Sequence, residues 1–192
     1  MIRFVFTVVA SACIMAFTGP AQAQTVASLG GGPASFFERL FGGPTSPTVR
    51  RLVSWPGDHR PGTIVISTSQ RRLYFVLGSG QAIQYGVGVG RPGFTWTGTK
   101  TVSMKREWPA WSPPAAMLRR RPDLPRYMPG GLGNPLGARA LYLGSSMYRI
   151  HGSNEPETIG YAVSSGCIRM TNADVIDLYN RTRIGTKVVV LR

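Results

Sequence analysis

Short β-rich runs joined by hairpin-length connections constrain the fold of this chain more than any other feature of its sequence. Three such runs follow one another at 63–67, 72–77 and 82–89. The segments between them, Thr68-Ser69-Gln70 and Gly78-Ser79-Gly80, are short enough for hairpins, so the three runs are predicted to form an antiparallel meander. Further strands are predicted at 142–143, 147–150 and 187–191.

One helix is clearly indicated near the C-terminus. Thr171 is suited to cap it, Asp174 follows three residues later as the acid of a capping box, and apolar residues at 175, 176, 178 and 179 supply a buried face. Together with the strands, this pattern predicts a mainly β domain with one or two short helices.

The first 23 residues are typical of an export signal. Arg3 precedes an apolar stretch at 4–17, and Ala21-Gln22-Ala23 offers a small-residue cleavage site. The apolar stretch is shorter than the ~18 to 20 residues of a membrane-spanning helix, so no transmembrane segment is expected after cleavage. Ala10-Ser11-Ala12-Cys13 loosely resembles a lipoprotein box, which makes lipidation of Cys13 an alternative way of processing the leader.

Residues 24–62 are rich in Gly, Pro, Ser and Thr and are predicted to form a flexible spacer. Residues 63–192 then form one domain of ordinary size. Within that domain the segment 91–137 is long for a connection, which favours a lid or a binding insertion. Its arginine run at 119–121 is expected either to face solvent or to contact carboxylates of a substrate.

The chain is strongly basic, with a formal net charge of +14 at pH 7. Such a charge suits an anionic partner, but export disfavours nucleic acid. The polyanions outside a bacterial cytoplasm are the carboxylates of the cell wall and anionic lipid head groups. Net charge alone selects no partner, and solubility explains it equally well.

Cys167 is the only cysteine beyond the leader, and His151 lies upstream of it within folding reach. A thiol attacks carbonyl carbon as the thiolate, and an imidazole produces that state by accepting the proton. We therefore expect a nucleophile and base pair in which the thiol has a lowered pKa. A backbone carbonyl near Gly152 is expected to fix the imidazole tautomer. The amides around Gly166 and Cys167 are candidate donors to an oxyanion. A buried, purely structural cysteine is the alternative.

No metal or cofactor is expected, because a zinc site needs three or four ligands and the His and Cys residues do not cluster in the sequence.

Two segments resemble a known family. Ile150-His151-Gly152-Ser153-Asn154-Glu155-Pro156, followed by Ser164-Ser165-Gly166-Cys167-Ile168-Arg169-Met170, resembles the paired signature of the L,D-transpeptidase (YkuD) catalytic domain. Thr97-Gly98-Thr99 resembles a turn of that family, and Asn134-Pro135-Leu136-Gly137 resembles the stretch before its central strands. The similarity extends over 63–192.

The resemblance implies a β-sandwich-like fold and a peptidoglycan L,D-transpeptidase, which is exported to the periplasm and associated with the cell wall. Enzymes of this kind cleave the bond before the terminal D-Ala of a tetrapeptide stem and hold the remainder as a thioester. They then transfer the acyl group to an amine, either of a second stem as a 3-3 crosslink or of an outer-membrane protein or lipoprotein. The resemblance also implies a carbapenem target.

By the match, Cys167 is the nucleophile and His151 the general base and acid. The residues that shape the substrate pocket and the oxyanion site are Gly152, Ser164, Ser165, Gly166 and Arg169. The chain departs from the common pattern at three positions, with Ser165 in place of histidine, Arg169 in place of asparagine and Trp96 in place of proline. The first two substitutions are typical of a Gram-negative branch.

Two other functions remain open at this stage. The same acyl-enzyme, resolved by water, gives an L,D-carboxypeptidase, because the choice between acceptors depends on how well the pocket excludes water. A non-catalytic, basic wall-binding module is the second alternative. A papain-like protease is disfavoured, since its cysteine precedes its histidine in the sequence.

Overall fold

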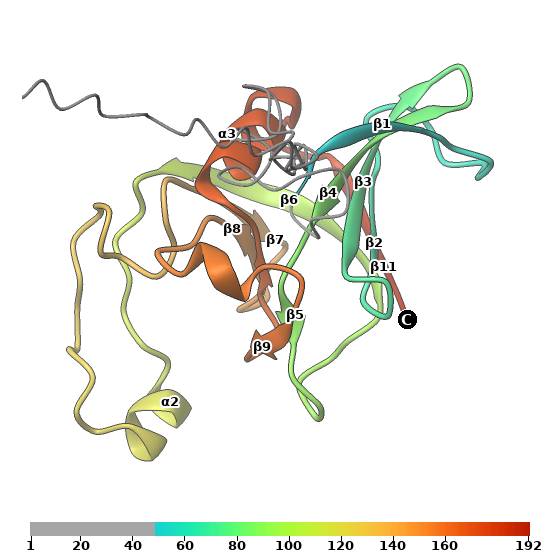
Figure 1. The fold of residues 1–192 in the computed structure, drawn as a ribbon. Coiled ribbons are helices and arrows are strands. Elements are labelled where there is room, and N and C mark those ends of the chain that lie inside the picture. Colours follow the sequence, from blue (N-terminus) through green and yellow to red (C-terminus); the bar gives the residue numbers. More distant parts are fainter. Residues whose placement is uncertain (1–48) are drawn as a thin grey trace, which may run out of the picture.

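The computed structural model describes residues 49–192, and Figure 1 shows the fold. The predicted leader at 1–23, Cys13 and most of the predicted spacer lie outside the described residues. None of the helices in the described part is long and apolar enough to cross a membrane.

A nine-stranded mixed sheet forms the body of the domain, with the strand order β1-β4-β3-β2-β11-β6-β7-β8-β10, and β5 and β9 form a separate pair. The strands are β1 (Arg51–Ser54), β2 (Ile64–Ser67), β3 (Arg72–Gly78), β4 (Gln81–Gly86), β5 (Val89–Gly90), β6 (Gly98–Glu107), β7 (Arg139–Leu143), β8 (Arg149–His151), β9 (Ala162–Ser164), β10 (Ile168–Arg169) and β11 (Lys187–Leu191).

The long strand β6 joins the two halves of this sheet. Its first residues pair with β11, and the residues from Val102 onward pair with β7 across an irregularity in register. Buried apolar side chains from both halves meet in one core cluster, among them Leu73 and Tyr85 from one half and Leu141 and Ile150 from the other. The expected mainly β architecture is thus confirmed, with the two halves of the sheet enclosing a common core.

The predicted meander is confirmed as β2, β3 and β4, which pair antiparallel in sequence order. The predicted C-terminal strand is β11, which pairs in parallel with β2. Two elements differ from the prediction. β1 lies in the segment predicted to be a spacer and pairs with β4. β6 lies in the predicted long loop, and it was not recognised because few of its residues are apolar or buried.

The predicted helix is α3 (Asn172–Arg181), and the Thr171 side chain accepts a hydrogen bond from the amide of Asp174 at 3.2 Å. A second short helix, α2 (Ala115–Arg120), lies in the long segment between β6 and β7, well away from the sheet in Figure 1. One turn of 3-10 helix, η1 (Pro156–Thr158), follows β8.

Candidate active site

Strands β8 and β10 place the two candidate catalytic residues on one face of the sheet. The strands pair in parallel, with Ile168 opposite Ile150 and Arg169 opposite His151. Ile150, Ile168 and Met170 are fully buried in the core. Because side chains alternate along a strand, odd-numbered residues lie on the other face. Those residues, which line a common cavity, are Arg149, His151, Cys167 and Arg169.

The cavity over this face has a volume of about 410 Å³ and a largely apolar wall on its far side. That wall comes from the long segment before β7, including α2, and contributes Trp111, Met117 and Leu136. The expectation that 91–137 contains a binding insertion is consistent with this placement. Of the predicted arginine run, Arg120 lines the cavity, Arg121 pairs with Asp123 at 2.7 Å, and Arg119 is exposed.

His151 is buried, and its Nδ1 lies 2.6 Å from the carbonyl oxygen of Gly152. Since a carbonyl only accepts hydrogen bonds, this contact assigns the proton to Nδ1 and leaves Nε2 as the basic nitrogen. Burial lowers the pKa of His151 to about 4. The contact with Gly152 opposes this shift, and the positive charges of Arg169 and Arg149 add to it. The imidazole is therefore neutral near pH 7.

Cys167 is partly exposed as a residue, and its Sγ lies 3.8 Å from the carbonyl oxygen of Met147. Burial raises the pKa of the Cys167 thiol, while hydrogen bonding and charge from Arg149, and the charge of Arg169, act in the opposite direction. The expectation of a lowered thiol pKa was wrong, because burial outweighs the two arginines. The resting pair is a neutral thiol and a neutral imidazole.

The turn before Cys167 is held by Ser164. The Ser164 hydroxyl donates to the carbonyl oxygen of Cys167 at 2.6 Å and accepts from the amide of Gly166 at 3.1 Å. The Gly166 amide is thus already engaged. No hydrogen bond from the Cys167 amide to another described residue is observed, so this amide is the better placed of the two candidate oxyanion donors. Ser164, predicted to belong to the substrate pocket, lines the cavity but is bonded within the turn.

Trp96 supports the same turn from outside. Its indole Nε1 donates to the carbonyl oxygen of Gly166 at 2.8 Å, and its ring stacks on Tyr148 with centroids 4.5 Å apart. Gly166 has φ 108°, and a Cβ built there would lie 2.6 Å from a ring carbon of Tyr148. Glycine is required here for both reasons. Trp96 was noted in the sequence only as a departure from proline.

Gly152 lies at a close approach of three segments. A Cβ at this position would collide with Oδ1 of Asn172 and lie 3.0 Å from the amide nitrogen of Ala138. The same Asn172 oxygen accepts a hydrogen bond from that amide at 2.9 Å. The first residue of α3 therefore fixes the start of β7 beside the end of β8, where His151 is located.

The two remaining predicted pocket residues have protein partners. Arg169 donates to the carboxylate of Glu155 at 2.9 Å and to the Thr158 hydroxyl at 3.4 Å, while still lining the cavity. Ser165 also lines the cavity, and its hydroxyl accepts from the Arg91 guanidinium at 3.5 Å.

Sequence reasoning did not single out Arg149 or Tyr148, which also line the cavity. For Arg149 a signal was present, because it lies two residues before His151 on a predicted strand and so shares its face. Within residues 49–192, no group of three or more His, Cys, Asp and Glu side chains is arranged to hold a metal ion.

Comparison with known proteins connects this geometry to one family. The probable L,D-transpeptidase ErfK/SrfK of Escherichia coli is 33% identical over 75% of this chain and 48% of that protein. The crystal structure of L,D-transpeptidase 3 from Mycobacterium tuberculosis covers 68% of this chain and 60% of its own, with a TM-score of 0.54 and 21% identity. This likeness shows a common fold.

A Brucella melitensis structure described as a probable carnitine operon oxidoreductase is 46% identical, covers 74% of this chain and 93% of its own, and has a TM-score of 0.51. That description does not name a transpeptidase.

The chain spans about half the length of the curated relatives it matches. The family model for the L,D-transpeptidase catalytic domain, YkuD, matches residues 61–190, which include β2 to β10 and all but the last residue of β11. This chain belongs to the YkuD family of L,D-transpeptidase catalytic domains.

Proposed function

We propose that this protein is a peptidoglycan L,D-transpeptidase that acts through a thioester on Cys167. One observation carries the proposal. Cys167, which directly precedes β10, and His151, which ends β8, line one cavity, and the contact with Gly152 leaves Nε2 of His151 free to take a proton. Membership of the YkuD family supports the same chemistry.

In the first half-reaction, Cys167 Sγ attacks the carbonyl carbon before the terminal D-Ala of a tetrapeptide stem, while His151 Nε2 accepts the thiol proton. The carbonyl oxygen becomes an oxyanion, and the Cys167 amide is its proposed donor. The intermediate then collapses. The amine of D-Ala leaves with the proton from His151, and the acyl group remains on sulfur as a thioester.

In the second half-reaction, an amine attacks the thioester carbonyl and His151 takes a proton from it. The thiolate leaves and regains a proton, so the enzyme returns to its neutral resting pair. An amine of a second stem gives a crosslink, whereas a lipoprotein lysine or the terminus of an outer-membrane protein gives protein attachment. We propose that the predicted export signal delivers this activity to the periplasm and its wall.

The cavity also fits an anionic peptide. Arg149 and Arg169 lie beside the thiol, and Arg120 lines the same cavity from α2. Guanidinium groups pair well with carboxylates, and a tetrapeptide stem carries several. We propose that Arg169 and Ser165 contact the stem, and that Gly152, Ser164 and Gly166 act by shaping the backbone around it.

The test is mass spectrometry of residues 24–192 incubated with disaccharide-tetrapeptide. We expect a crosslinked dimer that has lost one D-Ala, and no product with Cys167→Ala. Tyr161→Phe, at an exposed position outside the cavity, serves as the matched control and should retain activity. Tripeptide without dimer would identify water as the acceptor. Unchanged substrate with the wild type would contradict the proposal for stem peptides.

A second probe tests the nucleophile alone. L,D-transpeptidase 3 of M. tuberculosis has been crystallised with a faropenem-derived adduct. We propose that this chain is likewise acylated by penems and carbapenems, as expected of a carbapenem target. Intact-protein mass should rise by one adduct with the wild type and remain unchanged with Cys167→Ala. An adduct that persists in the variant would place the reactive group elsewhere.

A further inference from the structure

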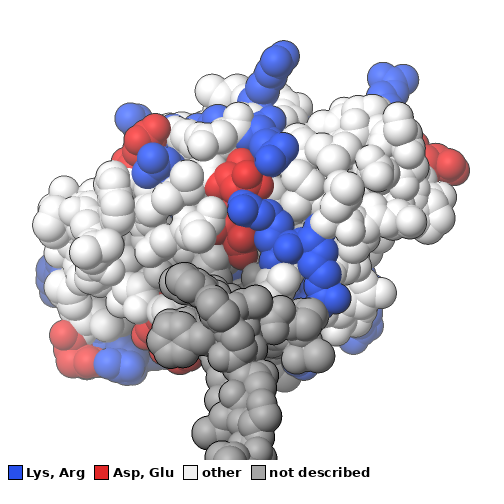
Figure 2. Space-filling model, turned by 45° about the horizontal axis from the view of Figure 1, so that its top comes forward, with Lys and Arg blue, Asp and Glu red and all other residues white. Residues whose placement is uncertain are grey.

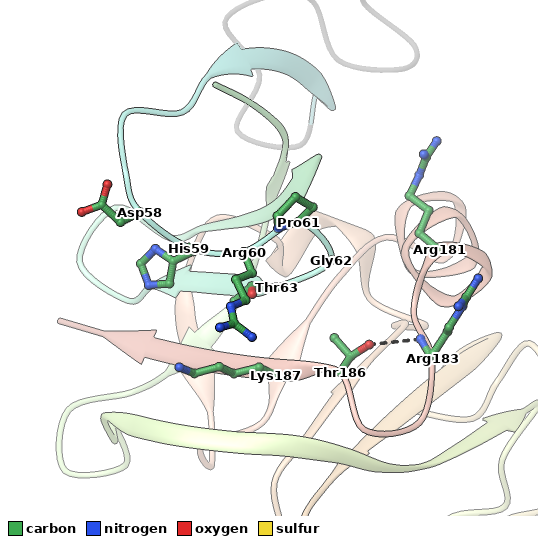
Figure 3. A pocket seen from close by; sticks show the side chains of 10 residues that line it. All are labelled: Asp58, His59, Arg60, Pro61, Gly62, Thr63, Arg181, Arg183, Thr186 and Lys187. Atoms are coloured by element: carbon green, nitrogen blue, oxygen red, sulfur yellow. Dashed lines mark hydrogen bonds between the residues drawn. The ribbon is translucent and has the colours of Figure 1, made fainter. Parts of the chain in front are cut away.

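A second cavity, of about 910 Å³, shares no residue with the active-site cavity. Figure 3 shows its two walls. One is the loop at 58–63 that leads into β2, and the other runs from the end of α3 to the start of β11. In the sheet, β6 and β7 separate β11 from β8, which carries His151.

The fold brings these walls together and holds both of them. β2 and β11 pair in parallel with Ile64 opposite Val188, so the residues that precede the two strands lie side by side. The loop is closed by hydrogen bonds from Thr63 N to the Arg60 oxygen at 3.1 Å and from Gly62 N to the Val76 oxygen at 2.8 Å. The backbone of this wall is therefore held in place by the fold itself.

The second wall is held in a similar way. The Arg183 amide donates to the Thr186 hydroxyl at 3.1 Å, drawn as a dashed line in Figure 3. The amides of Thr186 and Gly185 donate to the oxygens of Arg183 and Val102 at 3.1 and 2.8 Å.

Most of the charged side chains that line the cavity are cations, and three of them form no ion pair within residues 49–192. Arg60, Arg181, Arg183 and Lys187 line it, against a single acidic residue, Asp58. Of the four cations, only Arg181 is paired, with both oxygens of the Asp177 carboxylate at 3.0 and 3.1 Å. None of the ion pairs observed within residues 49–192 includes the other three.

These cations lie at different points around the hollow. In Figure 3 the Arg60 side chain extends toward β11, where Lys187 lies. Figure 2 shows that Lys and Arg side chains also gather in a band on the face it presents, with some acidic side chains among them. A concave surface lined by one sign of charge concentrates ions of the opposite sign.

The C-terminus of α3, which lies beside this cavity, does not disfavour an anion there. A helix C-terminus carries partial negative charge on its last carbonyl groups. At α3, Lys105 Nζ donates hydrogen bonds to the carbonyl oxygens of Tyr179 and Thr182 at 2.6 Å each, and its positive charge offsets their partial negative charge.

We propose that this cavity binds a phosphate-bearing anion, with Arg60 donating to phosphate oxygens from one wall, Arg183 donating from the other once its exposed side chain rotates from the position in Figure 3, and Lys187 contributing charge. A phosphate group offers acceptor oxygens in several directions and nearly two charges, which suits guanidinium groups on separate walls. A volume of about 910 Å³ accommodates more than one phosphate. The proposal does not depend on the proposed transpeptidase activity.

The test is calorimetric titration of the full 192-residue chain with tripolyphosphate at 150 mM salt. We expect saturable binding that Arg60→Gln and Arg183→Gln each weaken by about tenfold, the effect of losing one charge-assisted hydrogen bond. Arg106→Gln removes an exposed arginine outside both cavities and should leave the affinity unchanged. Arg183→Lys keeps the charge and should restore part of it. Thermal melting checks that each variant folds.

Equal weakening by Arg106→Gln would show diffuse attraction to a basic protein and would overturn the proposal. Absence of binding to both tripolyphosphate and lipid vesicles would also overturn it. Vesicles of phosphatidylcholine with and without phosphatidic acid distinguish the source of the phosphate. If vesicle binding requires both phosphatidic acid and Arg183, the ligand is a lipid head group. If the protein binds tripolyphosphate but not the vesicles, the ligand is a soluble phosphate compound. Cys167→Ala should bind as the wild type does, so failure of the enzymatic proposal remains distinguishable.

Discussion

The thiol of Cys167 is subject to two opposing effects. Burial in the cavity raises its pKa, and the guanidinium groups of Arg149 and Arg169 lower it. The thiol is therefore neutral, and His151 is buried and neutral too. The resting site thus contains no ion pair of thiolate and imidazolium. In the proposed reaction, the proton is transferred when substrate is in place.

Arg149 is the residue that most directly opposes burial at the thiol. We predict that Arg149→Met shifts the pH inflection of iodoacetamide alkylation to higher pH and slows alkylation at neutral pH severalfold, because the charged partner is lost. Arg149→Lys should recover part of the rate. In the wild type itself, the inflection should lie above the ~8.5 of a free thiol. An unchanged profile in Arg149→Met would show that Arg149 does not act on the thiol.

At the scale of elements, the sequence predicted the strands and helix whose pattern is local. The meander of β2 to β4 and the capped helix α3 follow from alternation, short turns and the Thr171 cap. β6 was missed because its side chains are mostly polar and its place is fixed by pairing with β7 and β11.

The same distinction applies to the site. The paired motif located Cys167 and His151, whereas the supports of the site are contacts between residues far apart in the sequence. Trp96 bonds to a residue 70 positions away, and Asn172 to one 34 positions away. A single sequence contains no signal for such a bond, since indole and amide groups find partners wherever the fold brings them.

Trp96 links the start of β6 to the turn that presents Cys167. We predict that Trp96→Phe, which keeps an aromatic ring on Tyr148 but removes the bond to the Gly166 oxygen, costs about 1 kcal/mol in the free energy of unfolding. Trp96→Ala should cost more, because stacking is lost too. Guanidinium denaturation measures both, and penem acylation should slow in the same order. If Trp96→Phe were as stable as the wild type, the hydrogen bond from Trp96 to the Gly166 oxygen would not stabilise the fold.

Asn172 and Gly152 form the joint between α3, β7 and β8. We predict that Gly152→Ala destabilises the fold by about 1 to 3 kcal/mol, the usual cost of an overpacked site. The new methyl group would displace the Asn172 amide from its bond to Ala138 or move the backbone beside His151. Gly133→Ala, where an added Cβ meets open space, is the matched control. Similar unfolding midpoints for the two variants would contradict the close packing of α3, β7 and β8 at Gly152.

At the scale of the whole molecule, the buried imidazole of His151 makes the stability of the fold depend on pH. The pKa of His151 is about 4 in the folded protein and near 6.5 in an unfolded chain. As pH falls through this window, the unfolded chain takes up a proton that the native protein does not, so stability decreases. Above about pH 6.5 the full stability is present. Burial raises the pKa of Asp177, but hydrogen bonds from Arg181 and Tyr85 and the nearby arginine charges lower it overall, so Asp177 loses its contribution only at lower pH, below its ordinary value.

We predict that the free energy of unfolding of the wild type falls by up to about 3 kcal/mol between pH 6.5 and 4, the value that this difference in pKa implies. His151→Asn cannot take up the proton, so its stability should vary less over the same range. Urea denaturation at intervals of pH measures both proteins, and their difference removes contributions they share, including that of Asp174, whose raised pKa acts in the opposite direction. Parallel pH profiles for the two proteins would mean that the imidazole accepts its proton in the folded state as readily as in the unfolded one, and a neutral resting base would then have to be abandoned.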